Sequence, residues 1–211
     1  METKSKRSRA PVASSAKRRL PGDPATRYAK QVVAGKIIAG PHVRAACARH
    51  IKDLETGKAR GLYWDIDAVK HALAFFSEVL CLNGGEFEGK PFETLGWQCF
   101  VIGSLFGWKT EDGHRRFRVG YVETAKGSGK SPLAAGIGMF GMVADGEARA
   151  EIYAAATKKD QAMVLFRDAV AMWQLSPELR KRLKTSGTGE NVWNLAYIEK
   201  GAFFRPISAD D

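Results

Sequence analysis

Cysteine is scarce in this chain. The 211 residues include three, Cys47, Cys81 and Cys99, which lie far apart. An odd, scattered set cannot form the disulfide framework that small secreted domains use. The sequence therefore predicts a protein of a reducing compartment, and we expect a cytoplasmic location. His42 and His50 flank Cys47, but no fourth ligand is evident, so the sequence favours an ordinary helix over a metal site here.

Long apolar runs are also missing. No stretch approaches the roughly 20 residues that a membrane-spanning helix needs, and the first residues lack the apolar core of a secretory signal. Hydrophobic residues still make up 45% of the chain, which is enough for a substantial core. We therefore expect a globular protein with no membrane partner, built as one medium domain or as a domain with an appendage.

Negative charge is in short supply. The chain has 23 Asp and Glu against 33 Lys and Arg, for a formal net charge of +10. Such an excess predicts an anionic partner such as nucleic acid. Residues 1–22 are basic and poor in apolar side chains, so they predict a disordered tail, either solvated or in contact with DNA. A second basic group is a candidate for weak DNA contact. It consists of Arg180, Lys181, Arg182 and Lys184.

The stretch from Phe117 to Ala144 has the pattern of a phosphate-binding loop. Phe117–Val122 is β-branched and aromatic, which predicts a buried strand. Glu123–Gly129 is small, polar and glycine-bearing, which predicts a turn, and Leu133–Val143 predicts a buried helix. A strand, a glycine loop ending in Gly-Lys-Ser and a helix, in that order, are typical of nucleotide-binding proteins.

Each residue type in this loop suits phosphate chemistry. A helix N-terminus presents N–H groups without intrahelical partners, and glycines let the backbone approach a phosphate closely. Lys130 can reach the β and γ phosphates of ATP, and the Ser131 hydroxyl can bind Mg²⁺. The match is incomplete, because Thr124 stands where the pattern has its first glycine. The predicted cofactor-binding residues here are Gly127, Ser128, Gly129, Lys130 and Ser131.

Helices dominate the region before the loop. We expect helices over Ala25–Ala34, His42–Leu54 and Asp67–Leu82, with Asp67 as the cap of the third. Residues 23–90 are therefore predicted to be a helical N-terminal region. An apolar helix ending near Phe106 should follow Trp97 and Gln98.

Strands and helices alternate after the loop. We expect a strand at Glu151–Ala156, a helix capped by the segment 157–160, and a short helix capped by Ser176. Val192–Ile198 and Ala202–Ile207 predict a hairpin. This order favours an α/β fold with a mainly parallel sheet. No strongly apolar run ending in Asp or Glu follows the loop, so 91–211 is predicted to be an incomplete P-loop ATPase core that lacks the acidic Walker B strand.

Trp97 and Gln98 could serve a nucleotide base. A glutamine amide both donates and accepts, which matches the N6 and N7 edge of adenine, and an aromatic ring can stack on a base. A buried tryptophan beside a surface glutamine explains the same two residues equally well, so both interpretations stay open.

Several pieces of the chain together resemble the N-terminal ATPase part of the large terminase subunit of tailed bacteriophages. The resemblance starts near Pro91 and covers more than half of the chain. The matching pieces are Phe92–Gln98, Tyr121–Ser131, Leu133–Ala135, Ala144–Glu147, Tyr153–Ala162 and Phe203–Asp210.

The resemblance implies a partial P-loop NTPase of the RecA/ASCE type, and a motor that uses ATP and Mg²⁺ to move viral DNA into a prohead. It implies that Gln98 contacts adenine and that Lys126, four residues before Lys130, acts with Lys130 on the γ-phosphate. The implied partners are double-stranded DNA, the small terminase subunit, the portal protein and further copies of the chain. Because the family's acidic strand and nuclease would follow Asp211, we expect an N-terminal fragment with little hydrolysis and no nuclease activity.

Two other functions remain compatible with the residues. One is a different P-loop enzyme, such as a helicase-like ATPase or a small-molecule kinase. The other is a non-catalytic, basic nucleic-acid-binding protein whose glycine loop is vestigial.

Overall fold

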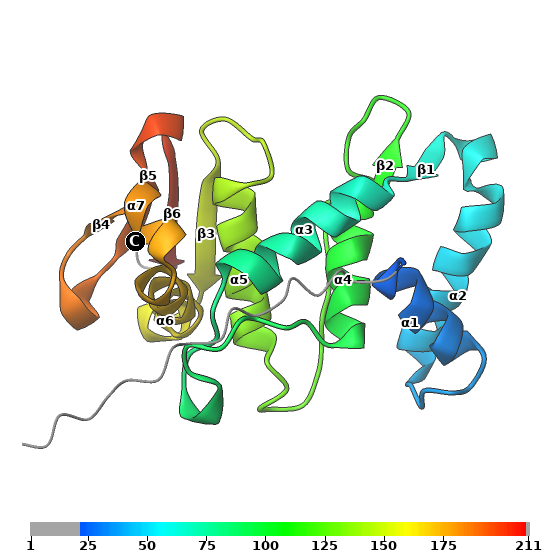
Figure 1. The fold of residues 1–211 in the computed structure, drawn as a ribbon, viewed down its shortest axis with the longest axis horizontal. Helices are drawn as coiled ribbons and strands as arrows, with labels where there is room; N and C mark the ends of the chain where they lie inside the picture. The colour runs from blue at the N-terminus through cyan, green and yellow to red at the C-terminus, as the bar shows by residue number, and fades with distance from the viewer. Residues whose placement is uncertain (1–21, 210–211) are drawn as a thin grey trace, which may run out of the picture.

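The computed structural model describes residues 22–209, and Figure 1 shows their arrangement. The predicted basic tail lies almost wholly outside these residues, as do Asp210 and Asp211. The helical elements are α1 Pro24–Val33, α2 Pro41–Thr56, η1 Gly57–Arg60, α3 Ile66–Val79, η2 Gly85–Phe87, α4 Gly96–Gly107, α5 Lys130–Val143, α6 Lys159–Leu175, α7 Pro177–Arg182, η3 Gly189–Asn191 and η4 Ile198–Lys200. The strands are β1 Leu62–Trp64, β2 Trp108–Thr110, β3 Glu151–Ala156, β4 Lys184–Ser186, β5 Asn194–Tyr197 and β6 Ala202–Ser208.

The N-terminal half is helical, and the helices lie close to their predicted bounds. α1 packs against α2 and α4, and α3 packs along α4 (Figure 1). The predicted cap of α3 was wrong by two residues. Asp65 caps the helix, because its carboxylate accepts from the backbone N–H of Asp67 at 3.1 Å and of Ala68 at 2.9 Å. A capping residue must stand just before the helix in extended backbone, and Asp67 already lies in the first turn.

Two short strands that the sequence did not predict close this half. β1 and β2 pair antiparallel, with Tyr63 opposite Lys109. Each has three residues, too few for an alternating pattern to stand out in the sequence. Their pairing brings Trp64 and Trp108 together at a ring distance of 5.3 Å.

The C-terminal half contains a four-stranded sheet in the order β3-β6-β5-β4. β3 and β6 run parallel, whereas β6–β5 and β5–β4 are antiparallel. The predicted hairpin is confirmed, but the prediction of a mainly parallel sheet was wrong. A short turn can join only antiparallel neighbours, and the turn at Lys200 and Gly201 joins β5 directly to β6.

Helices α5 and α6 cover one face of this sheet. Phe204 of β6 meets Phe166 of α6 at a ring distance of 5.6 Å. A Cβ atom on Gly138 of α5 would lie 2.8 Å from the Phe204 ring, so this glycine permits a close helix–sheet approach. Phe140 on α5 contacts Phe106 of α4 at 4.6 Å and Phe75 of α3 at 5.5 Å. These rings join α3 and α4 to the C-terminal half in one hydrophobic core, while Ala29, Val32 and Cys47 form a second, smaller cluster of α1 and α2.

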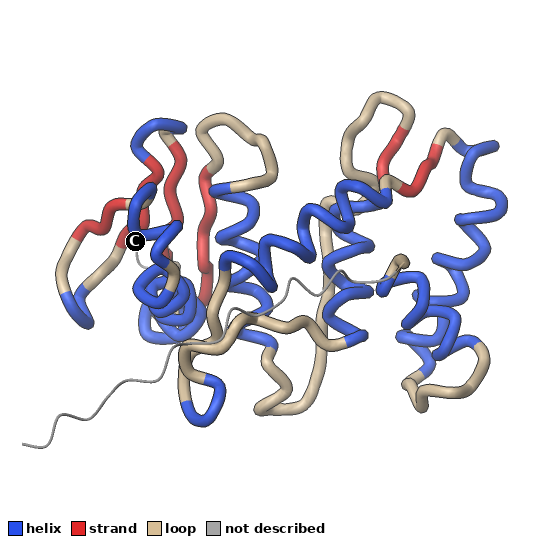
Figure 2. The backbone as a smooth tube through the Cα atoms, viewed as in Figure 1, coloured by secondary structure: helices blue, strands red, loops and turns tan. Residues whose placement is uncertain are grey.

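The strand predicted at Phe117–Val122 does not form. The segment is irregular, as the backbone trace shows (Figure 2). Val119 and Tyr121 are each 85% exposed. The pattern of residues suits a strand, but backbone groups form a strand only when a neighbouring strand pairs with them. No described strand pairs with this segment.

Of the two helix caps predicted for the C-terminal half, one forms and one does not. The cap predicted in 157–160 was wrong: α6 begins after Lys158, without a side-chain capping bond. The cap predicted for Ser176 is confirmed, since its hydroxyl accepts from the N–H of Leu179 at 3.4 Å. A lysine has no acceptor to offer at such a position, whereas a serine hydroxyl does.

Candidate nucleotide-binding site

The glycine loop leads directly into α5. Gly127 has φ +80° and Gly129 has φ +82°, a left-handed backbone region that residues with a Cβ rarely adopt. The hydroxyls of Thr124 and Ser128 are joined by a hydrogen bond across the loop. Gly129 is the N-cap residue, so α5 begins at Lys130, three residues earlier than predicted. Ser131 and Pro132 lie in the first turn, where the missing N–H of proline costs nothing.

Lys130 lies folded over its own loop. Its Nζ donates to the carbonyl oxygens of Thr124 at 2.6 Å and Ala125 at 2.9 Å. The ammonium group is therefore held over the loop, at the positive end of the α5 dipole. A phosphate bound at this helix end would lie within reach of the Lys130 ammonium group.

Gln98 lies beside the loop although it is 31 residues away in sequence. A Cβ atom on Gly129 would be 3.4 Å from its Nε2 atom. The side chain is 3% exposed, and its Oε1 atom accepts from the N–H of Leu95 at 2.8 Å. The first turn of α4 thus holds the amide of Gln98 against Gly129. Trp97 is partly buried and packs against the main core.

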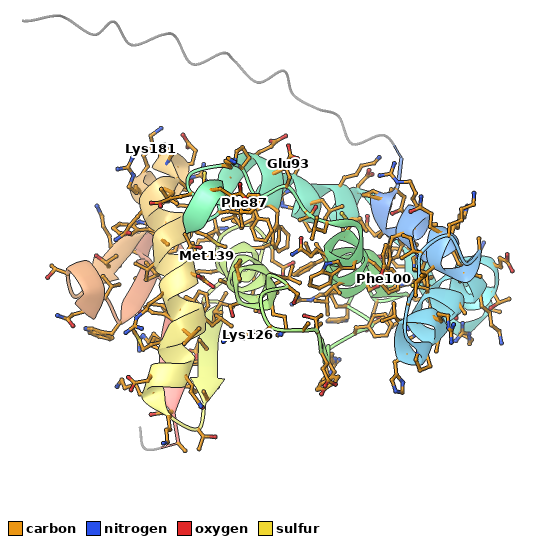
Figure 3. All side chains as sticks on the ribbon, turned by 90° about the horizontal axis from the view of Figure 1, so that it is seen from below. Phe87, Glu93, Phe100, Lys126, Met139 and Lys181 are labelled. Carbon is orange, nitrogen blue, oxygen red and sulfur yellow. The ribbon has the colours of Figure 1, made fainter. Side chains whose placement is uncertain are left out.

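The remaining predicted site residues fall in two places. Lys126 and Gly127 are exposed, and Ser128 and Ser131 are partly buried, all within the loop or the first turn of α5. The four cations proposed for DNA lie on α7 and at the start of β4, all exposed. Figure 3 shows Lys126 and Lys181 on well-separated parts of the molecule. The structure therefore assembles the loop residues with Gln98 but keeps the α7 cations apart from them.

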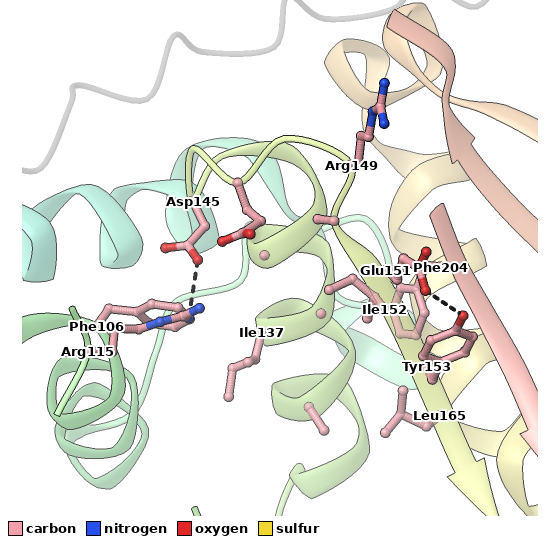
Figure 4. A pocket seen from close by; sticks show the side chains of 15 residues that line it. Phe106, Arg115, Ile137, Asp145, Arg149, Glu151, Ile152, Tyr153, Leu165 and Phe204 are labelled. Carbon is pink, nitrogen blue, oxygen red and sulfur yellow. Dashed lines mark hydrogen bonds and ion pairs between the residues drawn. The ribbon is translucent and has the colours of Figure 1, made fainter. Parts of the chain in front are cut away.

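A groove of about 540 Å³ runs between α5 and β3 (Figure 4). Arg115 and Asp145 form an ion pair across its mouth at 3.1 Å. Burial raises the pKa of Asp145, against the opposing effect of Arg115 and Lys109. Sequence reasoning missed this pair, because the two residues are 30 positions apart and share no motif. Asp145 follows the C-terminus of α5, so the groove mouth and the loop lie at opposite ends of that helix.

The loop residues fit a magnesium nucleotide by their chemistry. Open space surrounds the Cα atom of Gly127, where a Cβ would meet nothing within 4 Å. The ammonium group and the N–H groups of the helix start are donors suited to the phosphate oxygens, and the Ser131 hydroxyl oxygen is a ligand suited to Mg²⁺. Among residues 22–209, no group of three His, Cys, Asp or Glu side chains could hold a metal ion.

Residues 96–192 match the family model of the terminase large subunit, ATPase domain. The predicted terminase resemblance is therefore confirmed over these residues, whereas the predicted matching piece Phe203–Asp210 lies outside them. The terminase match begins at the first residue of α4 and contains Gln98, the glycine loop and α7. It leaves α1 to α3 outside. A comparison with curated proteins gave no match.

A solved structure has a fold similar to that of 68% of this chain. It is the crystal structure of the HK97 bacteriophage large terminase, with a TM-score of 0.56 and 21% sequence identity. The match covers 68% of this chain and 28% of that terminase. At this identity the likeness shows the fold alone. In the described part of the chain, no helix has the length and apolar character to cross a membrane.

Proposed function

We propose that this chain is the ATP-binding motor portion of a phage or prophage DNA-packaging terminase. The observation that carries the proposal is the glycine loop at the start of α5, with Lys130 Nζ folded over it, inside the segment that matches the terminase ATPase model. ATP with Mg²⁺ is the proposed cofactor. Nucleotide hydrolysis would drive the movement of double-stranded DNA into a prohead.

Each loop residue has a proposed role that follows from its chemistry. The N–H groups at the start of α5 bind phosphate oxygens, and Lys130 exchanges the carbonyls of Thr124 and Ala125 for the more strongly accepting phosphate. The Ser131 hydroxyl oxygen would coordinate the Mg²⁺ ion. Lys126 is exposed at the tip of the loop and is proposed to act on the γ-phosphate, as the family resemblance implies. Gln98, held against Gly129, is proposed to select adenine, and Trp97, which is partly buried against the core, is proposed to stack on the base.

The finer assignment of the core as a P-loop NTPase of the RecA type is part of this proposal. It is supported by the loop–helix unit at α5 and by the parallel β3–β6 pair, whose connection runs through α6, α7, β4 and β5. The outer edge of β3 has no strand beside it in the described residues, so it can accept one.

The proposed partners are those that the family resemblance implies. We propose double-stranded DNA, the small terminase subunit, the portal protein and further copies of this chain, acting in the cytoplasm of a bacterial host. The cations of α7 are exposed and available for weak phosphate contacts. Lys181 is already engaged by Glu178 at 2.9 Å, so it is the weakest of these candidates.

Calorimetry with ATP and Mg²⁺ tests the nucleotide site. Lys130→Ala should weaken binding by about tenfold to a hundredfold, because it removes a charge-assisted contact worth roughly 1.5–3 kcal/mol. Lys90→Ala is the matched control, since Lys90 lies over the Phe87 ring, away from the loop. Equal affinity in the parent chain and in Lys130→Ala would contradict the proposal.

A further inference from the structure

A second cationic surface lies where α2 meets the segment that follows β2. Its centre is the ring of Phe117, which carries two guanidinium groups. Arg49 of α2 lies 5.0 Å from the ring centroid, and Arg116 lies 4.8 Å from it. We call Arg49, Arg116, Phe117 and Arg118 the Phe117 patch. Cation–π contacts of this kind hold arginine side chains in place while leaving N–H donors on their edges.

Arg116 is the fixed member of the patch. It donates to Asp53 at 2.6 Å and also lies over the Trp108 ring at 5.3 Å. Asp53 is 4% exposed and pairs with Arg60 as well. Burial alone would raise the pKa of Asp53, but the hydrogen bonds from Arg116 and Arg60 outweigh it and lower that pKa. The single carboxylate of Asp53 therefore pairs with two guanidinium groups, so a net positive charge remains beneath the patch.

Arg49 and Arg118 are the members that can bind a partner. Both are exposed, and neither has a carboxylate partner among the residues that the structure describes. Lys52 is exposed one helical turn after Arg49, on the same face of α2. Arg118 and Arg115 also line a groove of about 430 Å³ beside Phe117. The free donors are thus spread over two elements around one ring.

We infer that the Phe117 patch binds the phosphate backbone of DNA. Guanidinium groups match phosphate oxygens with two parallel hydrogen bonds, and rings that preorganise them reduce the entropy lost on binding. Cations spread along a surface suit a chain of phosphates better than one isolated anion. The patch lies on α2 and the β2–α5 connection, whereas the cations Arg180, Lys181, Arg182 and Lys184 lie on α7 and at the start of β4. This inference rests on the proposed function, in which DNA is the partner.

Fluorescence anisotropy tests whether the Phe117 patch binds DNA. The probe is a labelled duplex of arbitrary sequence, and the full chain is titrated at several salt concentrations. The double variant Arg49→Gln, Arg118→Gln should bind more weakly on every sequence. The slope of log K against log salt should become shallower by about 2, since each lost phosphate contact removes about 0.9. Arg49→Lys with Arg118→Lys should keep the slope. Arg116 is left unchanged because its pair with Asp53 holds the fold.

Two controls separate this surface from general charge and from the nucleotide site. Lys30→Gln with Lys36→Gln removes the same charge from exposed positions on and just after α1, and should leave the slope unchanged. A parental slope in the Arg49, Arg118 glutamine variant would overturn the inference, as would an equal loss in the lysine control or no DNA binding by the parent chain. Calorimetry with ATP and Mg²⁺ on the same samples reports on the nucleotide proposal independently, because the patch variants should bind ATP normally.

Discussion

The indole N–H of Trp108 donates to Nδ1 of His50 at 3.0 Å. This contact fixes the tautomer of the imidazole, because an accepting Nδ1 leaves the proton on Nε2. The Nε2 atom lies 2.8 Å from the hydroxyl of Thr26, which in turn donates to Asp23. Asp23 also accepts from the indole of Trp64 at 2.8 Å. A partly buried hydrogen-bond chain thus links α1, α2, β1 and β2, and it requires His50 to be neutral.

Acid should therefore destabilise the helical half. Burial, with Arg116, lowers the pKa of His50 to about 4, against the carboxylates of Asp23 and Asp53. The unfolded chain binds the proton more readily, so the contribution is complete above pH 6.5 and is lost as pH falls toward 4. It amounts to about 3 kcal/mol. Denaturant unfolding between pH 7.5 and 4 measures it. His50→Gln should lower the free energy of unfolding at pH 7.5 and make it depend less on pH. A steep pH dependence in that variant would show that another group causes the acid sensitivity.

Gly127 and Gly113 form a matched pair for the loop. Their φ angles are +80° and +81°, and a Cβ on either would meet nothing within 4 Å. Alanine at each position should cost about 1 kcal/mol of folding free energy through backbone strain alone. Only Gly127→Ala should also weaken Mg-ATP binding, because only that residue lies in the phosphate loop. Calorimetry on both variants, with thermal melts, decides this, and equal ATP affinities would argue against the loop as the binding site.

A single substitution can separate the structural role of Gln98, which accepts a hydrogen bond from Leu95, from its proposed role in selecting adenine. Gln98→Glu keeps the acceptor that binds the N–H of Leu95 but removes the amide donor beside Gly129. We expect α4 to stay folded and the preference for ATP over GTP to disappear in competition binding. The ratio of the two affinities is the readout, since the added charge repels both nucleotides alike. Equal binding of ATP and GTP by the parent chain would contradict the assignment of adenine selection to Gln98.

Gly138 should tolerate no side chain, whereas Gly141 should tolerate a small one. A Cβ on Gly138 would come within 2.8 Å of the buried Phe204 ring and within 3.1 Å of the Ile152 side chain. On Gly141 the nearest atom is the flexible Cδ1 of Ile152 at 3.3 Å. Gly138→Ala should cost roughly 1–3 kcal/mol, and Gly141→Ala should be close to neutral because alanine favours the helix. Urea unfolding of both variants checks the difference, and equal losses would show that helix–sheet spacing is not set at Gly138.

The sequence by itself determined the local elements and the chemistry of the loop. Helix bounds near α1, α2, α4 and α6, the strand β3 and the β5–β6 hairpin follow from periodicity and turn residues, which act over a few neighbouring positions. Gly129, Lys130 and Ser131 are recognisable because phosphate binding needs those residue types in that order.

Tertiary structure alone decided which distant residues meet and which segments pair. Phe117–Val122 has the composition of a strand yet stays irregular, because pairing depends on a neighbouring edge rather than on its own residues. The parallel or antiparallel sense of each pair follows from the connections between strands. The approach of Gln98 to Gly129, the pair of Arg115 with Asp145 and the bond between Trp108 and His50 all join positions at least 30 residues apart. Such contacts arise only when packing of the hydrophobic core brings their elements together.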